Sequence, residues 1–132
     1  MTDAHAPELP GDAAALPTLD AAAMTQLQAL DPTGRGEFVR RVLLAFESSS
    51  ARLLQQLEVA RAATDRPAMR LVAHTLKSSS AAIGAPRLSQ LCAAAEKAIR
   101  LGTPDLDSQL DALQVELDEI LTIVTRMLKE LA

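Results

Sequence analysis

The sequence predicts an all-α protein, an antiparallel four-helix bundle preceded by a short N-terminal helix. The composition is 48% hydrophobic but only 2% aromatic, so Leu and Ala must do most of the packing, and both favour helices. Apolar residues recur at intervals of three, four and seven, with no strand-like alternation. Turn-forming residues divide the chain into long amphipathic segments with short connections, as in bundles of antiparallel helices.

The N-terminal half of the chain is expected to hold a tail, a short helix and a long helix. Residues 1–17 combine prolines with Ala, Asp and Gly, and predict a flexible tail that includes His5. Thr18 suits the N-cap of a short helix, LDAAAMTQLQAL, which the turn residues DPTGRG end. A long amphipathic helix is predicted from Glu37 to about Ala63. Its expected core stripe consists of Phe38, Val42, Ala45, Phe46, Leu53, Leu57 and Ala60.

Three further helices follow, each bounded by residues that favour helix ends. Asp65 suits an N-cap with a proline in the first turn, and Gly84 suits the C-terminal stop. Pro86 opens the next helix, which the segment 102–104 closes, and the last helix covers about residues 105–131. The apolar stripes of these last two helices consist of Leu88, Leu91, Cys92, Ala95 and Ile99, and of Leu106, Leu110, Leu113, Leu117, Ile120, Val124, Met127 and Leu128.

Length and composition also limit the class of protein. The 132 residues suit one domain, expected over residues 18–132. The single cysteine, Cys92, leaves no disulfide framework and fits a reducing compartment. Because no signal sequence or membrane-length apolar run is present, a cytoplasmic protein without membrane contact is expected. A net charge of -4 without a basic stripe argues against nucleic acid as a partner. A freestanding monomer is expected, with a segment excised from a larger protein as the alternative.

The stretch LVAHTLKSSSAAIGA separates into two helix faces. At about 100° per residue, the core face consists of Met69, Val72, Leu76 and Ile83. His74 points almost directly away from this face and is expected to be accessible to another protein. Its neighbours on the helix surface, one or two turns away, are Arg70, Lys77, Ser78 and Ala81.

The surroundings of His74 suit a covalent carrier of a phosphoryl group. A neutral imidazole is a good nucleophile near physiological pH and can form covalent intermediates. Lys77 would neutralise part of the charge of a phosphoryl group, while Ser78 and Ala81 would leave room for an incoming catalytic centre. The sequence has no Gly-rich phosphate loop, no Walker-type lysine and no obvious carboxylate pair for magnesium, so transfer from ATP is not expected. No metal site is expected either, and Cys92 is interpreted as a small core residue.

The segment AHTLKSSSAAIGAPRLSQLC resembles the histidine-containing phosphotransfer (HPt) domain, and a weaker resemblance extends from about Leu19 to the C-terminus. The resemblance implies that His74 accepts a phosphoryl group from a receiver-domain aspartate and that Lys77 helps to hold it. It also implies response-regulator receivers and a hybrid sensor histidine kinase as partners. The chain would need no cofactor of its own, since Mg²⁺ would be bound by the receiver.

Further residues follow from the same resemblance. Many members have glycine where this chain has Ser78, so docking is expected to be modestly affected. The family places a Glu or Gln against the second ring nitrogen, and Glu96 occupies that position, although it could equally pair with Arg100 or Lys97. Some members have a basic residue near the phosphate, and Arg100 occupies its position. Docking of a receiver is expected to use the small residues Ser78 and Ala81, with Arg70 and Arg87 offering charge that complements its acidic active site.

The resulting hypothesis is a phosphorelay carrier, not an enzyme with its own ATP site. The alternative is a non-catalytic helical adaptor that binds receivers or sensor kinases without phosphotransfer. A small helical enzyme that uses His74 as a general base is a weaker third possibility, because the predicted site is a convex helix face without a concave pocket.

Overall fold

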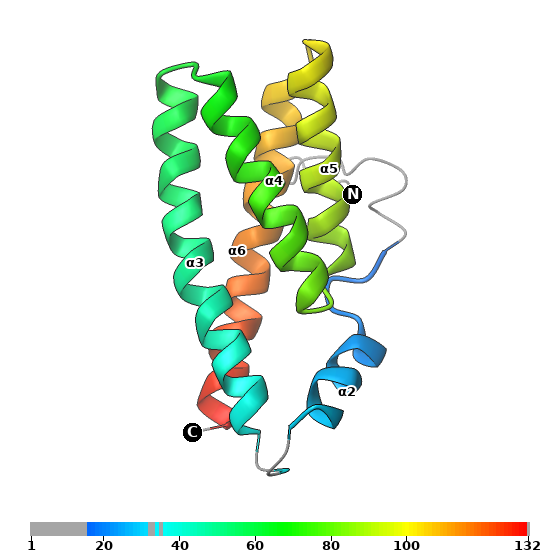
Figure 1. Ribbon diagram of the computed structural model, residues 1–132. Coiled ribbons are helices and arrows are strands. Elements are labelled where there is room, and N and C mark those ends of the chain that lie inside the picture. The colour runs from blue at the N-terminus through cyan, green and yellow to red at the C-terminus, as the bar shows by residue number, and fades with distance from the viewer. Residues whose placement is uncertain (1–15, 32–33, 35, 132) are drawn as a thin grey trace, which may run out of the picture.

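The computed structural model describes residues 16–31, 34 and 36–131, and these form five helices and no strand (Figure 1). The all-α prediction is therefore confirmed. The helices are α2 (Ala21–Ala29), α3 (Glu37–Ala62), α4 (Arg66–Ala82), α5 (Pro86–Leu101) and α6 (Leu106–Glu130). None of the helices in this described part of the chain has the length and apolarity that crossing a membrane requires.

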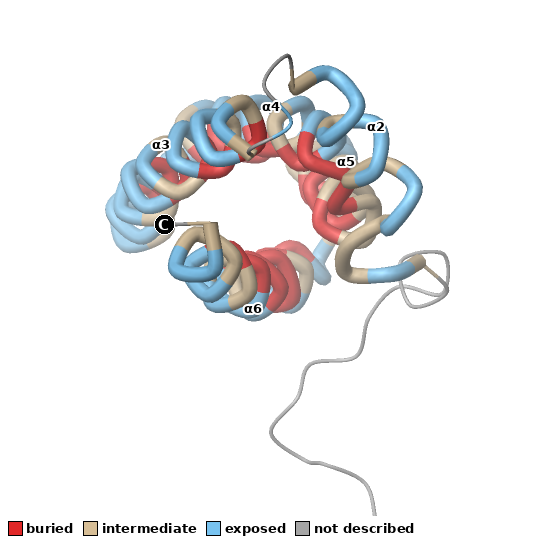
Figure 2. The backbone as a smooth tube through the Cα atoms, turned by 90° about the horizontal axis from the view of Figure 1, so that it is seen from below, coloured by how far each residue is buried: buried red, intermediate tan, exposed pale blue. Residues whose placement is uncertain are grey.

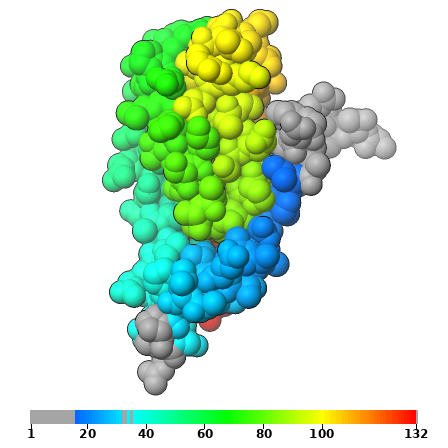
Figure 3. Space-filling model, turned by 45° about the vertical axis from the view of Figure 1, so that its right-hand side comes forward, coloured from blue at the N-terminus to red at the C-terminus, as the bar shows by residue number. Residues whose placement is uncertain are grey.

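The four long helices enclose one core. Contacts link α3 to α4, α4 to α5, α5 to α6 and α6 back to α3, and the buried residues face the common interior (Figure 2). Leucines predominate among the fully buried side chains, as expected of a chain with so few aromatic residues. Burial of this apolar surface is the main stabilising contribution to the fold. The short helix α2 buries none of its own residues and lies across one end of the molecule (Figure 3).

Along the first half of α3, the face of the helix that is buried differs from the predicted face. The predicted core positions Phe38, Val42 and Ala45 are half-buried or exposed, whereas their neighbours Val39 and Leu43 are buried. Apolar residues are adjacent in this part of the sequence, so both phases satisfy the helical repeat. The second half of the helix decides between them, because only the phase of Val39 and Leu43 continues into the buried stripe of Phe46, Ser50, Leu53, Leu57 and Ala60.

The helix ends match most of the predicted signals. Asp65 is the N-cap of α4, and its carboxylate accepts a hydrogen bond from the backbone N–H of Ala68 at 3.2 Å. Gly84 and Gly102 follow α4 and α5 with φ angles of 75° and 65°, a left-handed conformation that favours glycine. The predicted cap Thr18 is wrong, since Asp20 caps α2 instead.

A short segment before α2 is attached to the rest of the molecule. The Leu16 carbonyl accepts a hydrogen bond from Arg87 Nε at 2.9 Å, and the Asp20 N–H donates to the Gly84 carbonyl at 2.6 Å. The first 15 residues of the predicted tail lie outside the described residues. The carbonyls of Leu16 and Pro17, at the end of the predicted tail, instead accept hydrogen bonds from Arg87 at the start of α5.

Candidate functional site

His74 lies on the outer face of α4, and its side chain is 61% exposed. The apolar face of the same helix, which includes Met69, Val72 and Leu76, is buried against the other helices and fixes this orientation. His74 Nδ1 lies 3.0 Å from Glu96 Oε2 on α5. An ionised carboxylate only accepts hydrogen bonds, so Nδ1 must carry the proton in this contact. In the neutral ring, Nε2 then keeps its lone pair, on the side of the ring away from Nδ1.

Glu96 also accepts a hydrogen bond from the Lys77 Nζ, at 2.6 Å to its other oxygen. The carboxylate therefore joins two residues of α4, His74 and Lys77, to α5. The hydrogen bond from Lys77 lowers the pKa of Glu96 most strongly; partial burial opposes this effect and the His74 contact adds to it. Glu96 is thus a carboxylate at neutral pH and is held in place by two donors. Of the partners considered for it in the sequence, the ring of His74 is in contact, whereas no ion pair with Arg100 or Lys97 is found among the described residues.

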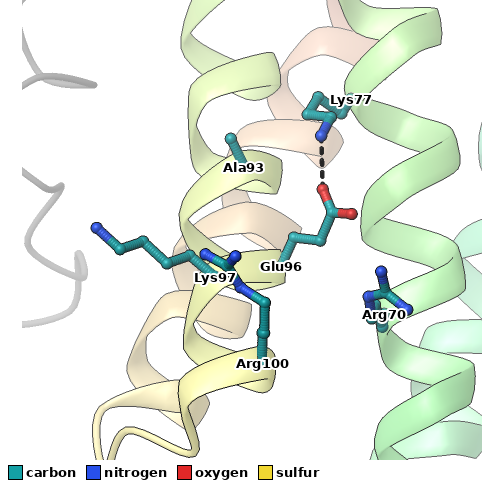
Figure 4. Close-up of a pocket in the computed structure, with 6 residues that line it drawn as sticks. All are labelled: Arg70, Lys77, Ala93, Glu96, Lys97 and Arg100. Carbon is teal, nitrogen blue, oxygen red and sulfur yellow. Dashed lines mark hydrogen bonds and ion pairs between the residues drawn. The ribbon is translucent and has the colours of Figure 1, made fainter.

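A hollow of about 360 Å³ lies between α4 and α5 next to this cluster (Figure 4). Four basic side chains line it together with one carboxylate: Arg70, Lys77, Lys97 and Arg100, with Glu96 and Ala93. Within the described part of the chain no ion pair is found for Arg70, Lys97 or Arg100. The positive charge of the hollow is therefore only partly compensated, although the chain as a whole carries a net charge of -4.

Small side chains extend from His74 towards the end of α4. Ser78 and Ala81 are exposed on the His74 side of the helix, as the helical geometry predicted. Ser80 is fully buried, and its hydroxyl donates to the Leu76 carbonyl. Ala81 also borders a hollow that is lined by Asp20, by Gly84 and by residues at the start of α5. The exposed side chains at the positions one and two turns beyond His74 on this face of α4 are therefore small.

Comparison with known protein families decides what this arrangement is. A family model described as the Hpt domain matches residues 41–128, well over half of the chain. The chain belongs to the Hpt domain family. This membership supports histidine phosphotransfer in a phosphorelay as the activity of the domain, and His74 lies within the matched residues.

The fold of this Hpt domain is also found in a solved structure. The crystal structure of histidine-containing phosphotransfer protein B from Pseudomonas aeruginosa PAO1 matches with a TM-score of 0.76 and 24% sequence identity. The match covers 86% of this chain and 96% of that chain. No curated protein sequence matches the chain significantly.

Arg87, a predicted docking residue of the Hpt domain, does not lie beside Glu96 and His74. Arg87 and Glu96 are nine residues apart on α5, which places them on opposite sides of the helix at about 100° per residue. The Arg87 guanidinium donates to the Leu16 carbonyl and to Thr18 Oγ1, and it lies 3.7 Å from the carboxylate of Glu116 on α6. The expectation that Arg87 offers free charge beside His74 is therefore wrong, because these internal partners already bind it.

Two residues of the Hpt domain were missed by the sequence analysis. Glu116 is only 3% exposed, and the signal for it was an acidic residue inside the apolar stripe between Leu113 and Leu117. Lys97 lines the hollow beside Glu96, where it had been considered only as a possible ion-pair partner.

The described residues contain no group of three or more His, Cys, Asp or Glu side chains placed to hold a metal ion. Cys92, one turn before Glu96, is fully buried, and this burial raises the pKa of its thiol to about 12. Its position among the core residues agrees with the structural interpretation of this cysteine.

Proposed function

We propose that this Hpt domain accepts a phosphoryl group on His74 from the aspartyl phosphate of one receiver domain and passes it to the aspartate of another. The observation that carries the proposal is the contact between His74 Nδ1 and Glu96 Oε2. This contact occupies one ring nitrogen and leaves Nε2 as the nucleophile on an exposed side chain.

In the forward step, the Nε2 lone pair attacks the phosphorus atom in line. A P–N bond forms, the P–O bond to the receiver aspartate breaks, and the aspartate leaves as a carboxylate. The ring gains positive charge, which the Nδ1–H shares with the Glu96 carboxylate. The return step reverses these changes on a second receiver. A Mg²⁺ ion would be held by the receiver's own acidic pocket, so the Hpt domain would supply only the nucleophile and its supporting groups.

Other assignments belong to the same proposal. Lys77 is a phosphate-stabilising residue that would exchange its bond to Glu96 for one to the phosphoryl group, and Arg100 is a second such candidate. Ser78, Ala81 and Arg70 contribute to docking. The ring of contacts among α3, α4, α5 and α6 supports an antiparallel four-helix bundle. The domain acts as a cytoplasmic, monomeric carrier between receivers and a hybrid sensor kinase, without an ATP site or a cofactor of its own.

The proposal is tested by incubating the protein with a phosphorylated receiver. We expect the receiver to lose its phosphate and this chain to gain an acid-labile, alkali-stable phosphoryl group, and a His74→Gln variant to gain none. Binding without transfer would show that the adaptor alternative is correct. Phosphate on Ser78 would contradict the assignment of His74.

A further inference from the structure

The hollow between α4 and α5 brings like charges together. Glu96 contacts His74, while Ser89, earlier on α5, donates to the carbonyl of Lys77, later on α4, so the two helices run in opposite directions. Arg70 precedes His74 by four residues and Arg100 follows Glu96 by four, which places the two arginines at the same level. Figure 4 shows them on facing helices across the hollow.

The described residues supply little negative charge to balance these cations. Among the residues that the structure describes, Glu96 is the only acidic one that lines the hollow, and both of its oxygens are already engaged by His74 and Lys77. Arg70, Lys97 and Arg100 are all exposed, and no ion pair within the described residues compensates them. Cations that face one another without a counter-charge repel each other, so a further negative group would be attracted to this hollow.

The phosphoryl group on His74 is poorly placed to be that anion. Nδ1 of the ring is directed at Glu96, which lines the hollow, and Nε2 is on the other side of the ring. A phosphoryl group on Nε2 is therefore attached on the side turned away from the Glu96 carboxylate. Apart from Lys77, which the proposed function assigns to the phosphoryl group, the cations of the hollow are therefore neighbours of the phosphoacceptor nitrogen but separate from it.

We propose that Arg70, Lys97 and Arg100 form a docking site for an acidic side chain of the receiver, distinct from the aspartate that carries the phosphoryl group. This inference rests on the proposed function and assigns Arg100 to partner recognition instead of phosphate stabilisation. With His74 as one fixed point and the hollow as a second, the orientation of the receiver on the helix pair is defined. Receivers without an acidic residue at the matching place are disfavoured, because three cations would then be covered without a counter-charge.

The experiment measures transfer from a phosphorylated receiver to wild type, Arg70→Glu, Arg100→Glu and the double variant. Arg126→Glu is the matched control, since Arg126 is an exposed arginine on α6. We expect each single charge reversal at the hollow to raise KM about fivefold, because loss of one exposed ion pair weakens binding by about that factor. The double variant should raise KM further. The salt dependence of KM is expected to weaken in the double variant and to stay unchanged in the control. Circular dichroism checks that each variant is folded.

The second readout is the half-life of the phosphohistidine after the receiver is removed. Reversing the charge of a residue that only docks the receiver leaves this half-life and kcat unchanged. Reversing the charge of a residue that holds the phosphoryl group shortens the half-life or lowers kcat. An unchanged KM, or a changed half-life, would overturn the inference while leaving His74 as the phosphoacceptor. Absence of any phosphate on wild type would instead overturn the proposed function.

Discussion

Glu96 and Glu116 have similar surroundings, but their pKa values are shifted in opposite directions. Both are largely shielded from solvent, and both face a basic side chain on a neighbouring helix. Glu96 has donors at 2.6 and 3.0 Å on its two oxygens, and its pKa is lowered. Glu116 has its nearest cation at 3.7 Å, one oxygen without a hydrogen-bond partner, and a pKa that burial raises. Direct donors, more than the mere proximity of a cation, keep a buried carboxylate ionised.

The surroundings of Glu96 and of Glu116 also lie in different parts of the molecule. Glu96 lies beside the exposed His74, where a partner must approach. Glu116 and Arg87 lie under the segment before α2 and attach it to the core helices. The Glu96 region is therefore expected to determine transfer, and the Glu116 region to determine stability.

The largest expected effect is on stability. Arg87→Ala removes the cation beside the buried Glu116 and the donor to the Leu16 carbonyl. We expect the free energy of unfolding to fall by about 3 kcal/mol, because a buried charge is left without its partner. Urea denaturation measures this change.

Adding Glu116→Gln to Arg87→Ala should recover part of that loss, since the unpaired charge is then absent. If the double variant were no more stable than Arg87→Ala, the loss would not come from the carboxylate. The exposed Arg126→Ala is the control and is expected to change stability by less than about 0.5 kcal/mol.

The attachment of α2 is tested by Gly84→Ala. Gly84 has a φ of 75°, and a Cβ there would lie 2.5 Å from the Cβ of Ala23. We expect a loss of about 2 kcal/mol from the left-handed backbone and the close contact, measured by thermal or urea unfolding. Gly102→Ala is the matched control, because its φ is 65° but its nearest neighbour would lie at 3.9 Å. An equal loss in both variants would show that contact with α2 contributes nothing.

A smaller effect is expected on the rate of transfer. Glu96→Ala removes the acceptor of His74 Nδ1–H, and we expect phosphate transfer from a receiver to slow about tenfold, the value of one hydrogen bond to a charged group. Glu96→Gln keeps an oxygen that can accept the same bond and should lie between wild type and Glu96→Ala. Rapid-quench measurement of phosphohistidine formation gives the rates. Equal rates in all three proteins would exclude a positioning role for Glu96.

The smallest expected effects are the pH dependences of the two glutamates. The pKa of Glu116 is raised in the folded protein, so its destabilising effect is complete above that pKa and is relieved as pH falls towards 4.5, the ordinary value. The pKa of Glu96 is lowered, so its stabilising effect is present above 4.5 and is lost as pH falls below it.

Urea unfolding at several pH values separates these two windows. The stability difference between wild type and Glu116→Gln should narrow on acidification while the pH is still above 4.5. The difference between wild type and Glu96→Gln should narrow only below 4.5. The same pH window for both differences would contradict the opposite directions of the two pKa shifts.

Local sequence signals predicted α4 well. Asp65 and Gly84 mark its ends, and the helical spacing of its apolar positions was enough to place His74 opposite the buried face that contains Val72 and Leu76. In the first half of α3, adjacent apolar residues fit two different buried faces, and packing against the other helices decided between them.

Contacts between distant residues were harder to predict. The resemblance to the family indicated the contact between His74 and Glu96. Nothing in the spacing of the residues favoured Lys77 as a partner of Glu96 over Lys97 and Arg100, which are nearer to it in the chain. Arg87 was misassigned for the same reason. Its partner Glu116 lies on another helix, and the side of α5 that meets α6 is set by the packing of the whole core.

The position of Cys92 gives this domain a natural reporter of helix separation. The thiol is fully buried, and with a pKa of about 12 it remains protonated at neutral pH. A protonated, inaccessible thiol does not react with alkylating reagents, which require the thiolate. Because Cys92 is the only cysteine of the chain, the rate of its alkylation counts the opening events that expose the interior of α5. A phosphorylation that loosens or tightens the helices around His74 would thus be recorded by a residue that takes no part in the chemistry.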